Sequence, residues 1–104
     1  MAYRLLIQAY DKANYFSLLM IYLKETQSGN SLVLIQVDGI LDHESIPVVE
    51  KVCYRHLREK KEVRLSLEGL VHISREGRTF LQKMRQKIAI ESLPEFMQSE
   101  DFGK

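Results

Sequence analysis

The chain has 104 residues, enough for one compact domain and too few for two. Apolar residues make up 45% and charged residues 28%, which excludes a disordered chain. A net charge of +1 gives no overall reason to expect a nucleic-acid partner. The single cysteine, Cys53, excludes an internal disulfide and suits a reducing compartment. The longest apolar run, residues 18–23, is too short to cross a bilayer, so we expect a cytoplasmic protein without direct membrane insertion.

Residues 1–15 fit neither the helical nor the strand period, and we treat them as an N-terminal extension of a main domain, residues 16–104. Three interpretations of the extension stay open: an extra strand, a short helix, or an arm against a partner, including a second copy in a homodimer. Residues 16–24 and 32–37 are rich in β-forming side chains, and turn-forming residues at 27–30 separate them. They therefore predict an antiparallel hairpin.

A loop and a first helix are predicted next. Asp38 and Gly39 are expected to end the second strand, and Ser45 is expected to cap the helix, with Pro47 in its first turn. The helix is predicted from an apolar stripe at helical spacing: Val49, Val52, Cys53, His56 and Leu57. Because this helix joins two strands, we expect a right-handed β-α-β crossover.

Residues 63–87 predict a strand, a sharp turn and a second helix. Val63, Leu65 and Leu67 alternate with polar residues, which is the period of a strand, and Gly69 breaks the run. Ser74 is the expected N-cap of the helix. The buried stripe of that helix is predicted to be Gly77, Phe80, Leu81 and Met84, and the helix is expected to run to about Lys87.

The rest of the chain completes an α/β pattern. Residues 88–90 predict a short last strand, and residues 92–94 begin a short final helix with Phe96 and Met97 as its apolar contacts. The order β-β-α-β-α-β-(α) predicts an α/β domain with a mixed sheet of about four to five strands.

Two of these segments resemble the STAS domain family, which includes anti-sigma factor antagonists and the cytoplasmic domains of sulfate transporters. The family has a Gly-Glu-Leu-Asp loop before its first helix, and this chain has Gly39-Ile40-Leu41-Asp42 there. The family also has a strand, an Asp-Ser-Ser-Gly-Leu turn and a second helix, where this chain has residues 65–78. The resemblance covers residues 16–94 and implies a STAS-like fold with helices packed mainly on one face of the sheet.

The chain departs from the family at the turn. The family Asp falls at Ser74, its first Ser at Arg75, and the Ser that a partner kinase phosphorylates falls at Glu76, while Gly77 keeps the family Gly. Glu76 carries one negative charge where a phosphate carries nearly two. It is either a fixed mimic of the phosphorylated state or an ordinary first-turn Glu. Ser74 is either a helix cap or a displaced phosphorylation site.

The resemblance implies a non-catalytic regulator that binds an anti-sigma kinase of ATPase fold, with a degenerate phosphorylation switch. The implied partner-binding residues are Asp42, His43, Ser74, Arg75, Glu76 and Arg78. The other interpretation of Asp42 is an Asp held by local backbone hydrogen bonds. Two further functions stay open: a small STAS subunit of a lipid-transport complex that binds a transporter ATPase, and a module that binds an anion or nucleotide.

No cofactor or metal is expected, and neither is an enzyme. His43, His56 and His72 lack the spacing of a metal site, and no catalytic or phosphate-binding motif is present. His56 is expected at the edge of the core, and Cys53 is expected to be buried and inert. The second helix carries five basic residues, which suit an acidic protein, a nucleotide phosphate, an anionic lipid or simply solvent: Arg75, Arg78, Lys83, Arg85 and Lys87.

Overall fold

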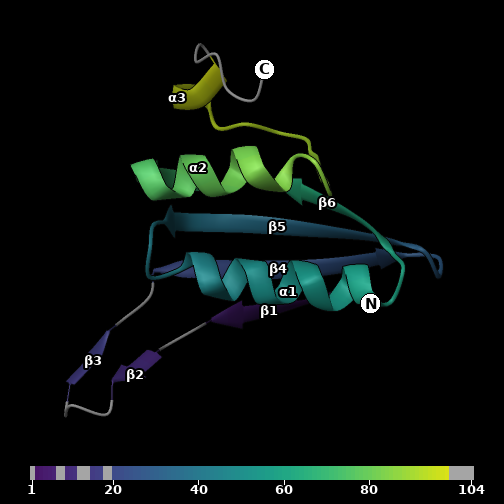
Figure 1. Cartoon of the computed structure of the whole chain (residues 1–104), viewed down its shortest axis with the longest axis horizontal. Coiled ribbons are helices and arrows are strands. Elements are labelled where there is room, and N and C mark those ends of the chain that lie inside the picture. The colour runs from purple at the N-terminus through teal and green to yellow at the C-terminus, as the bar shows by residue number, and fades with distance from the viewer. Residues whose placement is uncertain (1, 7–8, 12–14, 18–19, 99–104) are drawn as a thin grey trace.

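The computed structural model describes residues 2–6, 9–11, 15–17 and 20–98, with side chains described from residue 20 to residue 98 (Figure 1). The main sheet is mixed and has six strands in the order β1-β4-β5-β6-β8, with β7 as a further partner of β5. Its strands are β1 (Ala2–Leu6), β4 (Ile21–Ser28), β5 (Leu32–Leu41), β6 (Glu62–Ser66), β7 (Leu70–Ile73) and β8 (Ala89–Ile90). A separate two-stranded sheet pairs β2 (Ala9–Asp11) with β3 (Tyr15–Ser17).

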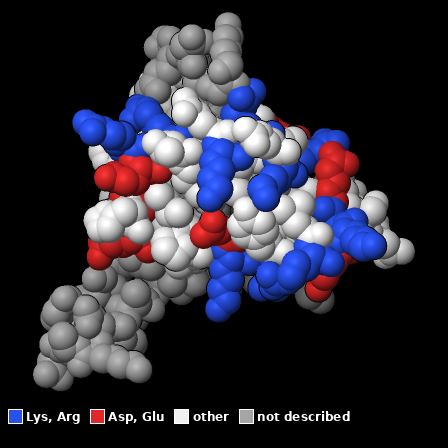
Figure 2. Space-filling view, in the orientation of Figure 1, with Lys and Arg blue, Asp and Glu red and all other residues white. Residues whose placement is uncertain are grey.

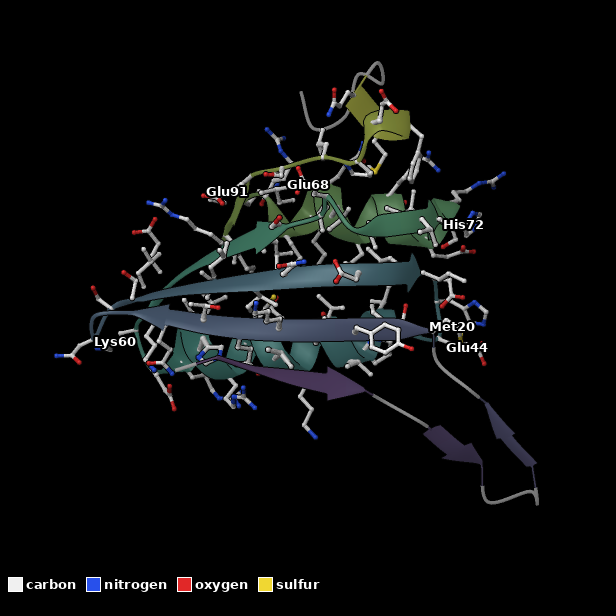
Figure 3. The ribbon with its side chains drawn as sticks, turned by 180° about the vertical axis from the view of Figure 1, so that it is seen from behind. Met20, Glu44, Lys60, Glu68, His72 and Glu91 are labelled. Carbon is white, nitrogen blue, oxygen red and sulfur yellow. The ribbon has the colours of Figure 1, made fainter. Side chains whose placement is uncertain are left out.

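The helices are α1 (Ile46–Arg58), α2 (Arg75–Met84) and the short α3 (Glu95–Gln98). In Figure 1, α1 and α2 lie side by side in front of the sheet, and Figure 3, seen from behind, shows the other face of the sheet without a helix. We call that second face the outer face. The α/β class, the mixed sheet and the placement of the helices mainly on one face are therefore confirmed, and the arrangement is compatible with a STAS-like fold.

The predicted hairpin is present, with different bounds. The strand predicted over residues 16–24 is instead divided between β3, which ends at Ser17, and β4, which begins at Ile21. β4 pairs with β5 antiparallel from Ile21↔Gly39 to Ser28↔Leu32. β1 adds a further antiparallel strand on β4, so residues 2–6 belong to the main sheet, and the boundary expected after residue 15 falls inside β3.

The prediction that Asp38 and Gly39 end the second strand is wrong, because β5 continues to Leu41. Gly39 has φ +103°, a conformation that suits glycine, and the register with β7 shifts between Gly39 and Ile40. The backbone also approaches closely here, since a side chain on Gly39 would collide with the Met20 carbonyl oxygen. Gly39 therefore lies inside a paired strand instead of a turn, and the extra residue of the bulge opposite it is Val71 of β7.

Strand β7 was not predicted. β6 pairs with the first half of β5, from Leu32 to Gln36, and β7 pairs with its end, from Gly39 to Leu41. Together they follow β5 as one interrupted parallel strand. The side chains of β7 read buried, exposed, exposed, buried, so the alternation that signals a strand is absent from its sequence.

The helices follow the predicted stripes. α1 buries Val49, Val52, Cys53 and His56, with Leu57 partly buried, and α2 buries Gly77, Phe80, Leu81 and Met84. α2 ends at Met84 and not near Lys87, because residues 85–87 form a turn before β8. In α3, Met97 is fully buried but Phe96 is 44% exposed, so the expectation that both are core contacts holds for Met97 alone.

Two polar side chains are buried between β4 and α1. The Nε2 atom of His56 lies 2.5 Å from the Glu25 carboxylate, and an Arg55 guanidinium nitrogen lies 2.7 Å from the same oxygen. Burying a carboxylate is costly unless cations and hydrogen-bond donors surround it, as they do here. The nearby Cys53 thiol is fully buried, and burial raises its pKa to about 12, so at neutral pH it is an unreactive thiol.

Candidate functional site

Two turns meet at one edge of the sheet. β5 and β7 are parallel, and their last residues, Leu41 and Ile73, are register partners. The loop 42–45 follows β5 and leads into α1, while Ser74 follows β7 and leads into α2. The Ser74 N–H donates a hydrogen bond to the Leu41 carbonyl oxygen at 3.0 Å. Loops after the carboxyl ends of neighbouring parallel strands are the usual place for a site in α/β proteins.

Gly77 brings the first turn of α2 against the end of β5. A Cβ atom on Gly77 would lie 2.6 Å from the Leu41 carbonyl oxygen and 2.8 Å from Ile73 Cγ1. Gly77 has an ordinary helical backbone, so the reason for glycine is the close approach and not a special φ. The glycine that the STAS resemblance pointed to therefore holds the two turns together.

The loop 42–45 is held by its own hydrogen bonds. Asp42 Oδ1 accepts hydrogen bonds from the N–H groups of Glu44 and Ser45, both at 3.1 Å. The Ser45 hydroxyl donates to the Ile40 carbonyl oxygen at 2.9 Å and accepts from the Asp42 N–H at 3.0 Å. Asp42 is thus held by local backbone hydrogen bonds, as one of its two interpretations expected. Its other carboxylate oxygen, Oδ2, accepts no hydrogen bond within residues 20–98.

Ser45 stands before the first helix as predicted, but it does not cap it. Its backbone is already helical, at φ −92° and ψ −18°, and its side chain makes no cap hydrogen bond. The hydroxyl instead points back to the end of β5, and Ser45 is 1% exposed. The prediction of a capping hydroxyl is therefore wrong at Ser45.

Ser74 is a true N-cap. Its backbone is extended, at φ −81° and ψ 173°, and its hydroxyl accepts the Gly77 N–H at 3.0 Å. Arg78 folds back onto the same turn, where its Nη1 atom donates to the Ile73 carbonyl oxygen at 3.2 Å. The Ser74 hydroxyl and the Arg78 guanidinium are thus both engaged within the fold.

Glu76 lies in the first turn of α2 and is exposed. Its carboxyl pKa is lowered, mainly by a hydrogen bond from its own backbone N–H and then by one from the Ser74 hydroxyl, while desolvation acts in the opposite direction. Positive charge on His43 and Arg75 contributes less. The hydrogen bond from the Ser74 N–H to the Leu41 carbonyl oxygen brings the two turns close enough for His43 to act on Glu76. Glu76 is therefore a negative charge held in place at neutral pH.

Two apolar side chains border these turns, and sequence reasoning missed both. Val71 in β7 is 71% exposed, and Met20 just before β4 is 48% exposed. The Met20 carbonyl oxygen accepts the Ile40 N–H at 2.7 Å, and Ile40 pairs with His72, so these residues share one end of the sheet. Figure 3 shows Met20, Glu44 and His72 at that end. We call this the end surface: Met20, Asp42, His43, Glu44, Val71, His72, Ser74, Arg75 and Glu76.

The histidines do not come together as a metal site. His43 and His72 belong to the end surface, whereas His56 is buried against Glu25. Among the residues that the structure describes, no three His, Cys, Asp or Glu side chains are grouped so that they could hold a metal ion. The end surface thus offers charges, hydroxyls and apolar contacts, which are the groups of a binding surface.

Comparison with known proteins does not assign a function, so the proposal below is argued from the end surface. No protein-family model matches the chain, and no curated protein matches its sequence. Within the described part of the chain, none of the helices has the length and apolar character needed to cross a membrane.

Proposed function

We propose that this chain is a non-catalytic, cytoplasmic protein-binding regulator that resembles an anti-sigma factor antagonist. Its end surface would bind a partner kinase of ATPase fold. One observation carries the proposal: the hydrogen bond from Ser74 to Leu41 joins the two turns that correspond to the family's Asp loop and its phosphorylated turn. The segments that the STAS resemblance singled out are far apart in sequence, and they form one surface.

The exposed apolar residues support a protein as the partner. Val71 and Met20 lie beside the charged turns, so the end surface has apolar contacts next to polar ones. Protein interfaces commonly combine a small apolar centre with a polar rim. Val71 is 71% exposed, and an aliphatic side chain gains free energy when a partner covers it.

Glu76 supports the loss of phosphorylation control. By the resemblance it corresponds to the phosphorylated serine, it is ionised at neutral pH with its pKa lowered further, and the Ser74 hydroxyl helps to hold it. Phosphate adds nearly two charges, so Glu76 reproduces only part of the effect. Ser74 is not a convincing replacement site, because its hydroxyl already accepts the Gly77 N–H. The protein would thus bind its partner at a fixed strength set by Glu76.

The test is capture of partners from extract of the native cell, with the full chain immobilised and mass spectrometry as the readout. An ATP-binding anti-sigma kinase that is retained by the wild type and lost with Val71→Asp supports the proposal. A transporter ATPase or permease captured in the same way would replace the kinase and make the chain a subunit of a transport complex. Capture of neither would overturn the proposal.

A titration with the captured kinase tests the role of Glu76. Glu76→Ser removes the fixed charge, and we expect tighter binding if the charge mimics the phosphorylated state. Glu95→Ser, in the first turn of α3, is the matched control and should leave the affinity unchanged. Equal affinities for the wild type and Glu76→Ser would show that Glu76 is an ordinary first-turn residue.

A further inference from the structure

Charge is divided unevenly between the helices and the rest of the chain. The two segments 46–61 and 74–87, each a helix with the turn after it, contain ten Lys or Arg residues and three Glu residues. Their net charge is +7, whereas the whole chain has +1, so all other residues together carry −6. The near-neutral composition therefore conceals a strongly basic layer.

The two segments share one face of the molecule. α1 and α2 lie side by side in front of the sheet in Figure 1, and Figure 2 shows Lys and Arg spread across that face, with fewer Asp and Glu among them. Lys87, after α2, places its ammonium group 5.4 Å from the centre of the Tyr54 ring in α1. We call this surface the basic face, and define it by six exposed residues: Lys51, Arg58, Lys60, Lys83, Arg85 and Lys87.

Within residues 20–98, the charges of the basic face are not neutralised by ion pairs. The Lys and Arg side chains of the helical segments that form ion pairs within residues 20–98 are Arg55, with Glu25, and Lys61, with Glu59. None of the six basic-face residues forms an ion pair with a residue in the range 20–98. Cations that are gathered on one face without a carboxylate partner among the described residues raise the local potential and attract anions.

The basic face is distinct from the end surface. Figure 3 shows Lys60 at the end of the molecule opposite to Glu44 and His72. Lys60, Lys83, Arg85 and Lys87 all lie at or beyond the last turn of their helices, whereas the end surface is built at the beginnings of the same helices. A ligand on the basic face would therefore leave the end surface accessible to a protein partner.

We propose that the basic face binds an anionic phospholipid surface by electrostatic adsorption, without insertion of a segment. The molecule measures 41 × 33 × 20 Å, and the helices lie in its broad plane, so many cations can approach a flat surface together. Lysine side chains are long enough to reach lipid headgroups while the helices stay outside the membrane.

The same geometry is less suited to nucleic acid. A helix that reads duplex DNA enters the major groove, whereas α1 and α2 lie next to each other in one layer against the sheet. Binding of single strands uses exposed aromatic rings on which bases stack. The aromatic ring between the helices, Tyr54, is half-buried and lies under Lys87.

The test is sedimentation of the full chain with vesicles of phosphatidylcholine and phosphatidylglycerol in equal parts, and with vesicles of phosphatidylcholine alone. We expect binding to the anionic vesicles only, and weaker binding as salt is raised. Each basic residue near an anionic surface contributes roughly five-fold to the partition constant, so Lys83→Glu should lower it roughly ten-fold or more. Lys24→Glu is the matched control, because it makes the same change of charge on the outer face and should leave binding close to that of the wild type.

Several results would overturn the proposal. No binding to anionic vesicles would do so, and so would equal losses in Lys83→Glu and Lys24→Glu, which would assign any binding to overall charge. Fluorescence anisotropy with labelled duplex DNA of mixed sequence covers the other class of polyanion. Binding of DNA that Lys83→Glu weakens, without binding of vesicles, would assign the basic face to nucleic acid. Circular dichroism of both variants establishes that the compared proteins are folded.

Discussion

Ser45 and Ser74 occupy equivalent positions before the first two helices, but their hydroxyl groups have different structural roles. Each lies one residue before a helix, in a connection that begins at the end of β5 or β7. Ser45 is 1% exposed, and its hydroxyl hydrogen-bonds the Ile40 carbonyl and the Asp42 N–H. Ser74 is more exposed, and its hydroxyl caps α2 through the Gly77 N–H. One serine fixes a loop to a strand, and the other fixes a helix to a turn.

The difference follows from the backbone of each serine. Ser45 already has helical angles, so its side chain cannot turn forward to the free N–H groups of the first turn. Ser74 has an extended backbone, from which the hydroxyl reaches the third residue of the helix. Residue type and position relative to a helix thus do not determine the role of a serine. Whether a serine caps a helix also depends on how the preceding strand ends.

Gly77→Ala should have the largest effect on stability, because it disrupts the close contact between α2 and the end of β5. The new Cβ would lie 2.6 Å from the Leu41 carbonyl oxygen, so α2 must move away from the end of β5. We expect a loss of about 2–3 kcal/mol in the free energy of unfolding, despite the better helix propensity of alanine. Urea unfolding measures it, with Thr79→Ala at an exposed position of the same helix as the control. A stabilised Gly77→Ala variant would show that the close approach is not real.

Ser45→Ala should cost about 1–2 kcal/mol, because it leaves the Ile40 carbonyl and the Asp42 N–H without the Ser45 partner in a buried position. Ser45→Thr retains the hydroxyl and is the chemical control. The measurement is thermal unfolding of the three proteins. If Ser45→Ala lowered the stability no more than an exposed change such as Ser31→Ala, the hydrogen bonds of the Ser45 hydroxyl would not stabilise the fold.

Ser74→Ala should cost about 1 kcal/mol, the usual value of a lost N-cap, and Ser74→Asn should recover most of it. This rescue distinguishes the roles of the two serines, because asparagine can cap α2 but is too large for the buried site of Ser45. Thermal unfolding of the two asparagine variants side by side measures the difference. Equal costs of asparagine at both positions would contradict the assigned roles.

Local patterns predicted α2 better than they predicted β5. For α2, the cap and the stripe Gly77, Phe80, Leu81 and Met84 lie within eleven residues, and all were identified correctly. For β5, the pair Asp38-Gly39 has the composition of a turn, yet the strand continues. Hydrogen bonds outside the local segment decide this, because Gly39 donates to the Gly69 carbonyl and Ile40 donates to the Met20 carbonyl.

The candidate site was only partly predictable for the same reason. The two turns could be identified from their residues, but the exposure of Val71 depends on a bulge in how β7 pairs with β5. The burial of His56 follows from its helical spacing, whereas its partner Glu25 lies 31 residues away and carries no sequence signal. Periodicity thus predicts which face of an element is buried, and it does not predict which partner a polar side chain meets.

The smallest predicted effect concerns the hydrogen bond between Ser74 and Glu76. The folded pKa of Glu76 is lowered, so its ionised form stabilises the fold above the ordinary value of 4.5, and this stabilisation is lost as pH falls through the lowered pKa. The difference in unfolding free energy between wild type and Glu76→Gln should therefore be present at neutral pH and shrink in acid. In a Ser74→Ala background the difference should already be smaller at neutral pH, because one of the two main hydrogen bonds to the carboxylate is gone. Urea unfolding of the four proteins across this pH range measures both effects. A difference that is the same with and without the Ser74 hydroxyl would mean that the backbone N–H alone holds Glu76, and Ser74 would then act only as a cap.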